Sequence, residues 1–80
     1  MTVIFSSVNQ QIHYSFICKN TLQFNVLESL LYNVEEYKKY KITENYFVCN
    51  GKKINRFDTL EENGIKNSDI ITLIQVDEEE

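Results

Sequence analysis

The sequence predicts an α+β fold in which one helix packs across a mixed β-sheet, with the elements in the order ββαββ. Three observations support this fold class. A strand-like segment, followed by one in which apolar and polar residues alternate, indicates a hairpin near the start of the chain. Apolar residues at helical spacing come next. Two strand-like segments around a hairpin turn, a short helical turn and a last strand complete the pattern.

The first hairpin is expected within residues 2–18. Its first strand, Thr2 to Val8, begins with Thr-Val-Ile-Phe, and β-branched and aromatic residues favour strands. In its second strand every other residue is apolar, namely Ile12, Tyr14, Phe16 and Cys18. This period of two places those four side chains on the core side and His13 on the solvent side.

The helix is expected to begin near residue 20 and to fade between Tyr37 and Thr43. Apolar residues recur every four positions, at Leu22, Val26, Leu30 and Val34, with Leu27 and Leu31 beside them. The pattern predicts that Val26 and Leu30 face the sheet. The candidate N-cap residues are Asn20, Thr21 and Asn25, the last with Glu28 three residues later.

Turn signals define the second half of the chain. Asn50-Gly51, after a short strand at residues 46–49, is the strongest short signal for a hairpin turn. Thr59 and Glu62 form a capping box, which opens a helical turn before the last strand at residues 70–76. The core between helix and sheet is expected to contain Val26, Leu30, Phe47, Leu60, Ile65, Ile71 and Leu73.

The turn, the capped turn and the closing strand of residues 46–76 follow one another in register. The residues concerned are Phe47-Val48-Cys49-Asn50-Gly51-Lys52-Lys53-Ile54, Asp58-Thr59-Leu60, Gly64-Ile65 and Asp69-Ile70-Ile71-Thr72-Leu73-Ile74-Gln75. At this spacing they resemble the ubiquitin/SUMO family and its β-grasp fold. Over residues 2–34 the resemblance rests on the order of hairpin and helix. It implies a ubiquitin-like domain at residues 1–76, followed by an acidic tail at residues 77–80.

The chain departs from the ubiquitin pattern in two places. The connection from Leu31 to Tyr46 is about one helical turn longer than the resemblance implies, so a longer helix or a larger loop is expected. Modifiers of this family end in Gly-Gly, whereas the two glycines of this sequence, Gly51 and Gly64, lie inside the domain. We therefore expect neither conjugation of the chain nor the activity of the sulfur-carrier relatives.

Composition favours a binding module over an enzyme. A chain of 80 residues has little interior for a substrate-sized pocket. Without the four acids of residues 77–80, eight acids balance eight bases, so no nucleic acid is expected as partner. No apolar run reaches membrane-spanning length, and Cys18 and Cys49 lack the spacing of metal ligands. We expect that the protein is not an enzyme and that it binds no cofactor, metal ion or membrane. It is expected to be a monomer with reduced thiols, located inside the cell in the cytoplasm or the nucleus.

The candidate functional surface is the outward face of the sheet. If Phe47, Ile71 and Leu73 face the helix, the alternate residues of their strands point outward. With one residue from the adjoining loop, the predicted partner-binding residues are Ile4, Val8, Val48, Ile70, Thr72 and Ile74. The resemblance implies that receptor domains grip this face, as they grip the apolar patch of ubiquitin. Such a patch typically marks an interface, although strands favour Val and Ile on any face.

Alternatives remain for both the surface and the role. SUMO adds a strand from a partner peptide in the groove between second strand and helix, which Ile17, Lys19 and residues 29–39 would line here. Lys52, Lys53 and Arg56 are interpreted as a solvated turn, with a small basic patch as the alternative. The domain is expected to be an adaptor that docks its host protein onto ubiquitin-system machinery such as a proteasome receptor. The alternative is a permanent structural subunit of a larger multiprotein complex.

Overall fold

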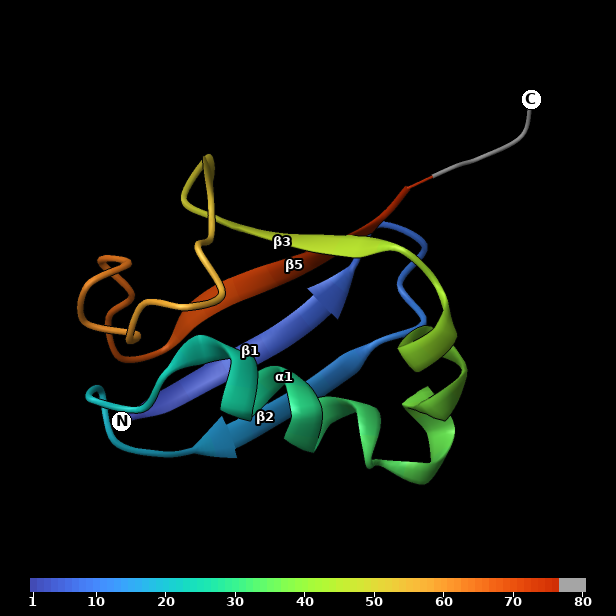
Figure 1. Ribbon diagram of the computed structural model, residues 1–80, viewed down its shortest axis with the longest axis horizontal. Coiled ribbons are helices and arrows are strands. Elements are labelled where there is room, and N and C mark those ends of the chain that lie inside the picture. The colour runs from blue at the N-terminus through green and yellow to red at the C-terminus, as the bar shows by residue number, and fades with distance from the viewer. Residues whose placement is uncertain (77–80) are drawn as a thin grey trace.

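In the computed structural model, helix α1 (Phe24–Tyr32) crosses one face of a mixed five-stranded sheet, as shown in Figure 1. The structure describes residues 1–76, and the predicted acidic tail at residues 77–80 lies outside them. The predicted α+β class is therefore confirmed. A second helix, the 3₁₀ helix η1 (Glu35–Ile42), was not expected and makes the connection from α1 to the sheet.

The first and last strands of the chain lie side by side in the middle of the sheet. The strands are β1 (Thr2–Ser7), β2 (His13–Ile17), β3 (Asn45–Cys49), β4 (Lys52–Lys53) and β5 (Asp69–Gln75). Their order across the sheet is β2-β1-β5-β3-β4. The last strand, β5, thus lies between β1 and β3, parallel to the first and antiparallel to the second. On both faces of the central strands, residues that are far apart in the sequence therefore lie next to each other.

Alternation along the central strands directs one side of each into the core. Phe5 of β1 pairs with Ile71 of β5, and Phe47 of β3 pairs with Leu73, and all four side chains are buried. Phe24 of α1 packs on this layer, its ring centroid 5.0 Å from that of Phe47 and 6.1 Å from that of Phe5. The predicted core residues that are buried are Phe47, Leu60, Ile65, Ile71 and Leu73. These predictions are confirmed.

The predicted orientation of the helix is wrong. Val26 and Leu30, expected in the core, are 44% and 45% exposed. The residues that α1 buries against the sheet are instead Phe24, Leu27 and Leu31, at positions i, i+3 and i+7. Both sets of residues satisfy helical spacing, so the rotation of the helix about its own axis decides which of them faces the sheet.

Main-chain contacts fix the start of α1. Gln23 occupies the N-cap position without a side-chain cap, so none of the predicted caps Asn20, Thr21 and Asn25 is used. The N–H of Phe24 donates to the carbonyl of Asp58, and the N–H of Asn25 donates to the carbonyl of Arg56, both at 2.9 Å. These bonds satisfy two of the N–H groups that the first helical turn leaves unpaired. The loop before the last strand thereby sets the rotation of the helix.

Helix η1 replaces the long helix end predicted between Tyr37 and Thr43. It buries Tyr37 and Tyr40, and the Tyr37 hydroxyl accepts a hydrogen bond from the N–H of His13 at 3.2 Å. Because β2 is an edge strand, fewer of its side chains are buried than the sequence predicted. The four residues expected on its core side differ: Ile12 is buried, Phe16 and Cys18 are half-buried and Tyr14 is exposed.

The two local turn predictions are confirmed. Asn50 and Gly51 have φ angles of 54° and 80°, and positive φ at both central residues is what a tight two-residue hairpin turn requires. The N–H of Thr59 donates to the Glu62 carboxylate at 2.9 Å, and the N–H of Glu62 donates to the Thr59 hydroxyl at 3.0 Å. Gly64, with φ of 75°, follows this capped turn and redirects the chain towards β5.

Candidate interaction surface

Cross-strand pairing gathers the predicted partner-binding residues on the face of the sheet opposite α1. Ile4 pairs with Ile70, and Val48 pairs with Thr72. Ile74 is two residues further along β5, on the same face. We call the six predicted residues the outer patch, namely Ile4, Val8, Val48, Ile70, Thr72 and Ile74. Five of them thus lie side by side on β1, β5 and β3.

Exposure varies across the outer patch. Ile70, at the start of β5, is 56% exposed. Val8, in the loop after β1, is 70% exposed and lies beside Ile74 near the other end of β5. The remaining members, Ile4, Val48, Thr72 and Ile74, are half-buried among their neighbours. The patch therefore has a packed floor with one exposed apolar side chain at each end.

Tyr46 also belongs to this face, although the sequence analysis did not single it out. It pairs with Ile74, and the ammonium of Lys53 lies 5.0 Å from the centre of its ring. Lys53 itself pairs with Val48. The signal was available in the sequence, because Tyr46 is two residues before Val48 and so shares its side of the strand.

The outer patch has a positive edge. Among the outward-facing residues of the five described strands none is a carboxylic acid, and the two basic ones are His13 and Lys53. The whole chain carries a formal charge of −4. Within the described strands this face therefore carries no acidic side chain, and a partner that covers them meets apolar side chains and, on the β3–β4 side, an ammonium group.

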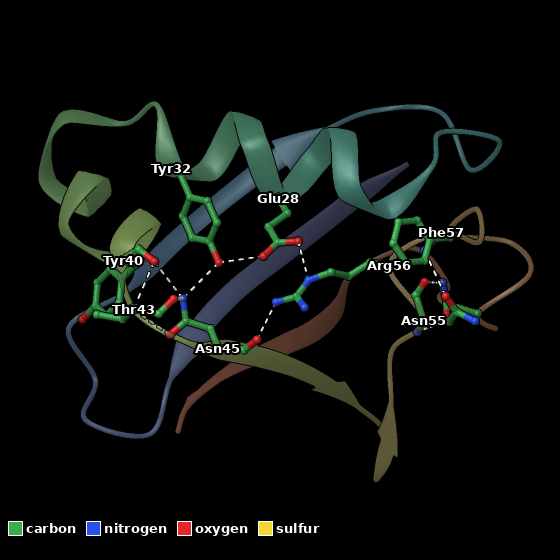
Figure 2. Close-up of polar contacts among 9 residues, drawn as sticks. Glu28, Tyr32, Tyr40, Thr43, Asn45, Asn55, Arg56 and Phe57 are labelled. Carbon is green, nitrogen blue, oxygen red and sulfur yellow. Dashed lines mark hydrogen bonds and ion pairs between the residues drawn. The ribbon is translucent and has the colours of Figure 1, made fainter. Parts of the chain in front are cut away.

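Arg56 does not join the lysines of the β3–β4 turn. Its guanidinium points under α1, where Nε donates to Oε1 of Glu28 at 2.7 Å and Nη2 donates to the carbonyl of Asn45 (Figure 2). The hydrogen bond to Glu28 raises the pKa of Arg56 further. Lys52 and Lys53 are exposed as the solvated turn predicts, whereas the guanidinium of Arg56 is turned away from them, so the basic patch of three residues is not formed.

Glu28 is the centre of a polar cluster that also contains Tyr32, Asn45 and Arg56 (Figure 2). The Tyr32 hydroxyl donates to Oε2 of Glu28 at 2.7 Å and accepts a hydrogen bond from Nδ2 of Asn45 at 3.1 Å. Burial, and then the hydrogen bond to Glu28, raise the pKa of Tyr32 and keep its hydroxyl protonated as a donor. Both carboxylate oxygens of Glu28 are occupied within the cluster. We conclude that it fastens α1, β3 and the loop at Arg56 together.

Ile17, the main apolar residue expected in the alternative groove between β2 and α1, does not lie in that groove. Ile17 pairs with Thr2, so its side chain lies on the outward side of β2 and not beside α1. On the helix side of β2, Phe16 pairs with the buried Val3 and packs against the core. The prediction that Ile17 lines a groove next to the helix is therefore wrong.

Ionisable residues elsewhere do not converge on one point. Within residues 1–76 no three His, Cys, Asp or Glu side chains are grouped as a metal site requires. His13 is exposed on β2. No helix in this part of the chain has the length and apolar character needed to cross a bilayer.

The two cysteines, Cys18 and Cys49, are free thiols. Cys49 is buried at the end of β3, with its Sγ 3.8 Å from Oδ2 of Asp69. Burial, and then the charge and hydrogen bond of Asp69, raise the pKa of Cys49 to about 11. Burial also raises the pKa of Cys18, and the nearby amino terminus partly offsets this effect. Because the thiolate is the reactive form, neither cysteine is poised as a nucleophile.

This thiol environment predicts slow chemistry at Cys49. At pH 8 we expect iodoacetamide to label Cys49 at least about tenfold more slowly in the folded protein than in urea. The folded state favours the neutral form of the Cys49 thiol. The contribution of this thiol to the free energy of unfolding is therefore complete below about pH 8.5, the ordinary thiol pKa, and is lost as the pH rises towards about 11.

Mass spectrometry of timed samples measures the labelling, and Cys18→Ser leaves Cys49 as the single thiol. Equal labelling rates in the folded and unfolded protein would contradict the expected protection of Cys49.

The sequence matches no known family model and no curated protein. Function must therefore be inferred from the fold and from the outer patch.

Proposed function

We propose that this chain is a ubiquitin-like interaction domain of the β-grasp class, and that its outer patch binds another protein. The order β2-β1-β5-β3-β4 with a parallel central pair supports the fold assignment. So do a helix that crosses one face of the sheet and a capped turn before the last strand. The resemblance of residues 46–76 to ubiquitin and SUMO agrees with these features.

The observation that carries the proposed function is the composition of the outer patch. Three neighbouring strands present Ile4, Ile70, Val48 and Ile74 on the face that α1 leaves uncovered. Burial of such apolar side chains is favourable by about 25 cal/mol for each Å² removed from water. A protein partner that covered this face would gain this energy without having to desolvate an acidic side chain of the strands.

The partner class that we propose is a component of the ubiquitin system, such as a proteasomal ubiquitin receptor. The domain would then act as an adaptor that brings its host protein to that machinery. Binding of this kind is reversible and depends on a few well-packed side chains near the centre of the interface.

Ile70→Asp tests the proposal, because Ile70 is exposed and the free domain can accommodate a charge there. In the complex the carboxylate would have to be desolvated against apolar partner atoms, so we expect binding to weaken at least about tenfold, or about 1.4 kcal/mol. Val48→Asp, in the middle of the same face, should weaken it as well. Titration of the ¹⁵N-labelled domain with a purified proteasomal ubiquitin-receptor domain gives both the affinity and the contact residues.

Val26→Asp is the matched control, since Val26 is similarly exposed but lies on α1, on the opposite side of the sheet. It should bind the receptor domain like the wild type. Equal loss of binding in both variants, or signal changes confined to α1, would remove the outer patch as the binding surface.

A further inference from the structure

A pocket of about 260 Å³ opens at one end of the outer patch, between the loop after β1, the end of β5 and η1. The residues that line it include Ser7, Val8, Asn9, Tyr40, Leu73 and Ile74. Val8 and Ile74 belong to both the pocket and the outer patch, so the two surfaces are continuous. The opposite wall is Tyr40, which η1 supplies.

The hydroxyl groups of Ser7 and Tyr40, which line the pocket, are already engaged in hydrogen bonds within the domain. The Ser7 hydroxyl donates to Oδ1 of Asn9 at 2.5 Å and accepts hydrogen bonds from the N–H groups of Gln11 and Ile12 at 3.1 Å. The Tyr40 hydroxyl donates to Oε1 of Gln11 at 3.2 Å. No residue that lines the pocket is charged. An occupant would therefore be held by apolar contact and would itself have to be uncharged.

The size of the pocket selects the kind of occupant. Pockets for drug-sized ligands have volumes of about 300–1,000 Å³, and 260 Å³ falls below that range. The volume suits a single large side chain. Tyr40 is 2% exposed and tied through its hydroxyl, so the wall that it forms is in place before any ligand arrives. A preformed pocket lowers the cost of ordering the interface on binding.

We propose that this pocket holds one large aliphatic or aromatic side chain of the protein that binds the outer patch. The inference rests on the proposed function, and it adds the chemistry of the partner. Across the patch from the pocket, beyond Ile74 and Tyr46, lies the ammonium of Lys53. The partner segment thus presents an apolar anchor to the pocket and a carboxylate to Lys53. Tyr40, from the 3₁₀ helix that replaces the predicted helix end, forms the wall against which this side chain would pack.

The test uses a random-peptide display library selected on the folded chain of 80 residues. The selected peptides should share one large apolar residue together with an acidic residue. A selected peptide should shift the methyl and ring signals of Val8, Tyr40 and Leu73 in NMR spectra. Its affinity should fall at least about tenfold for Val8→Arg, which places a charge at the rim of the pocket.

Leu30→Arg is the matched control, because Leu30 is an exposed apolar residue on the opposite side of the sheet. If Ile70→Asp abolishes peptide binding while Val8→Arg and the Tyr40 signals are unaffected, the pocket inference fails and the outer patch stands. If neither variant matters, both proposals fail. An empty selection, or a domain that dimerises through the pocket in size-exclusion chromatography, would also overturn the inference.

Discussion

Leu31→Ala is expected to lower the free energy of unfolding by about 2–5 kcal/mol, the range for truncation of a buried leucine. Leu31 has no exposed surface, and it lies with Phe24 and Leu27 on the side of α1 that covers the sheet. A domain of this size has about 4–12 kcal/mol of stability in total. The variant should therefore lose a large part of its stability, which urea denaturation followed by circular dichroism measures.

Leu30→Ala is the matched control, because it makes the same chemical change one residue earlier. Leu30 is 45% exposed, so its truncation should cost less than about 1 kcal/mol. A larger loss for Leu30→Ala than for Leu31→Ala would restore the helix orientation that the sequence predicted and would refute the observed one.

The failure to predict the helix orientation has a physical cause. Helix α1 is apolar on more than one side, so Val26 with Leu30 and Phe24 with Leu31 both satisfy helical periodicity. What selects between them is the hydrogen bonding of the first helical turn to the carbonyls of residues 56 and 58. Those partners lie more than thirty residues further along the chain, where no local pattern could reveal them.

Predictions that rest on residues close together in the sequence were confirmed more often than the prediction of the helix orientation. The positive φ angles at Asn50 and Gly51 and the reciprocal bonds of Thr59 and Glu62 follow from short motifs. The side on which a strand residue lies follows from counting, which is why five members of the outer patch share one face. Counting along a strand cannot show which strands are neighbours. The order of the strands in the structure does, and it brings Ile4 and Ile70 together although they are 66 positions apart in the sequence.

The pocket and the polar cluster escaped prediction for the same reason. Tyr40 reaches the pocket only because α1 ends at Tyr32 and a separate 3₁₀ helix begins. Arg56 was interpreted as part of a solvated turn or a basic patch with Lys52 and Lys53, because its partner Glu28 is 28 residues away in the sequence. A sequence shows that a charge is present, but the fold decides whether a second charge lies within reach.

Arg56→Met is expected to reduce the free energy of unfolding by about 1–3 kcal/mol, because it leaves the buried Glu28 carboxylate without its cation. The side chain of Glu28 is 11% exposed and that of Arg56 is 39% exposed. Solvent screens the partly exposed guanidinium, so the loss should fall below the range of a fully buried pair. Arg56→Lys should restore only part of the stability, because one ammonium cannot reproduce the forked bonds to Glu28 and the Asn45 carbonyl.

A double-mutant cycle measures the coupling between Glu28 and Arg56 apart from the effect of each residue alone. Glu28→Gln alone leaves Arg56 without its charge partner, whereas Glu28→Gln combined with Arg56→Met removes both charges and leaves a neutral amide beside Tyr32. We therefore expect the double variant to lose less stability than the sum of the two single losses, with a coupling of about 0.5–3 kcal/mol in urea denaturation. Strictly additive losses would mean that the two groups act independently. The loop at Arg56 would then be held to the start of α1 by the hydrogen bonds of Gln23, Phe24 and Asn25 to the carbonyls of residues 56–58.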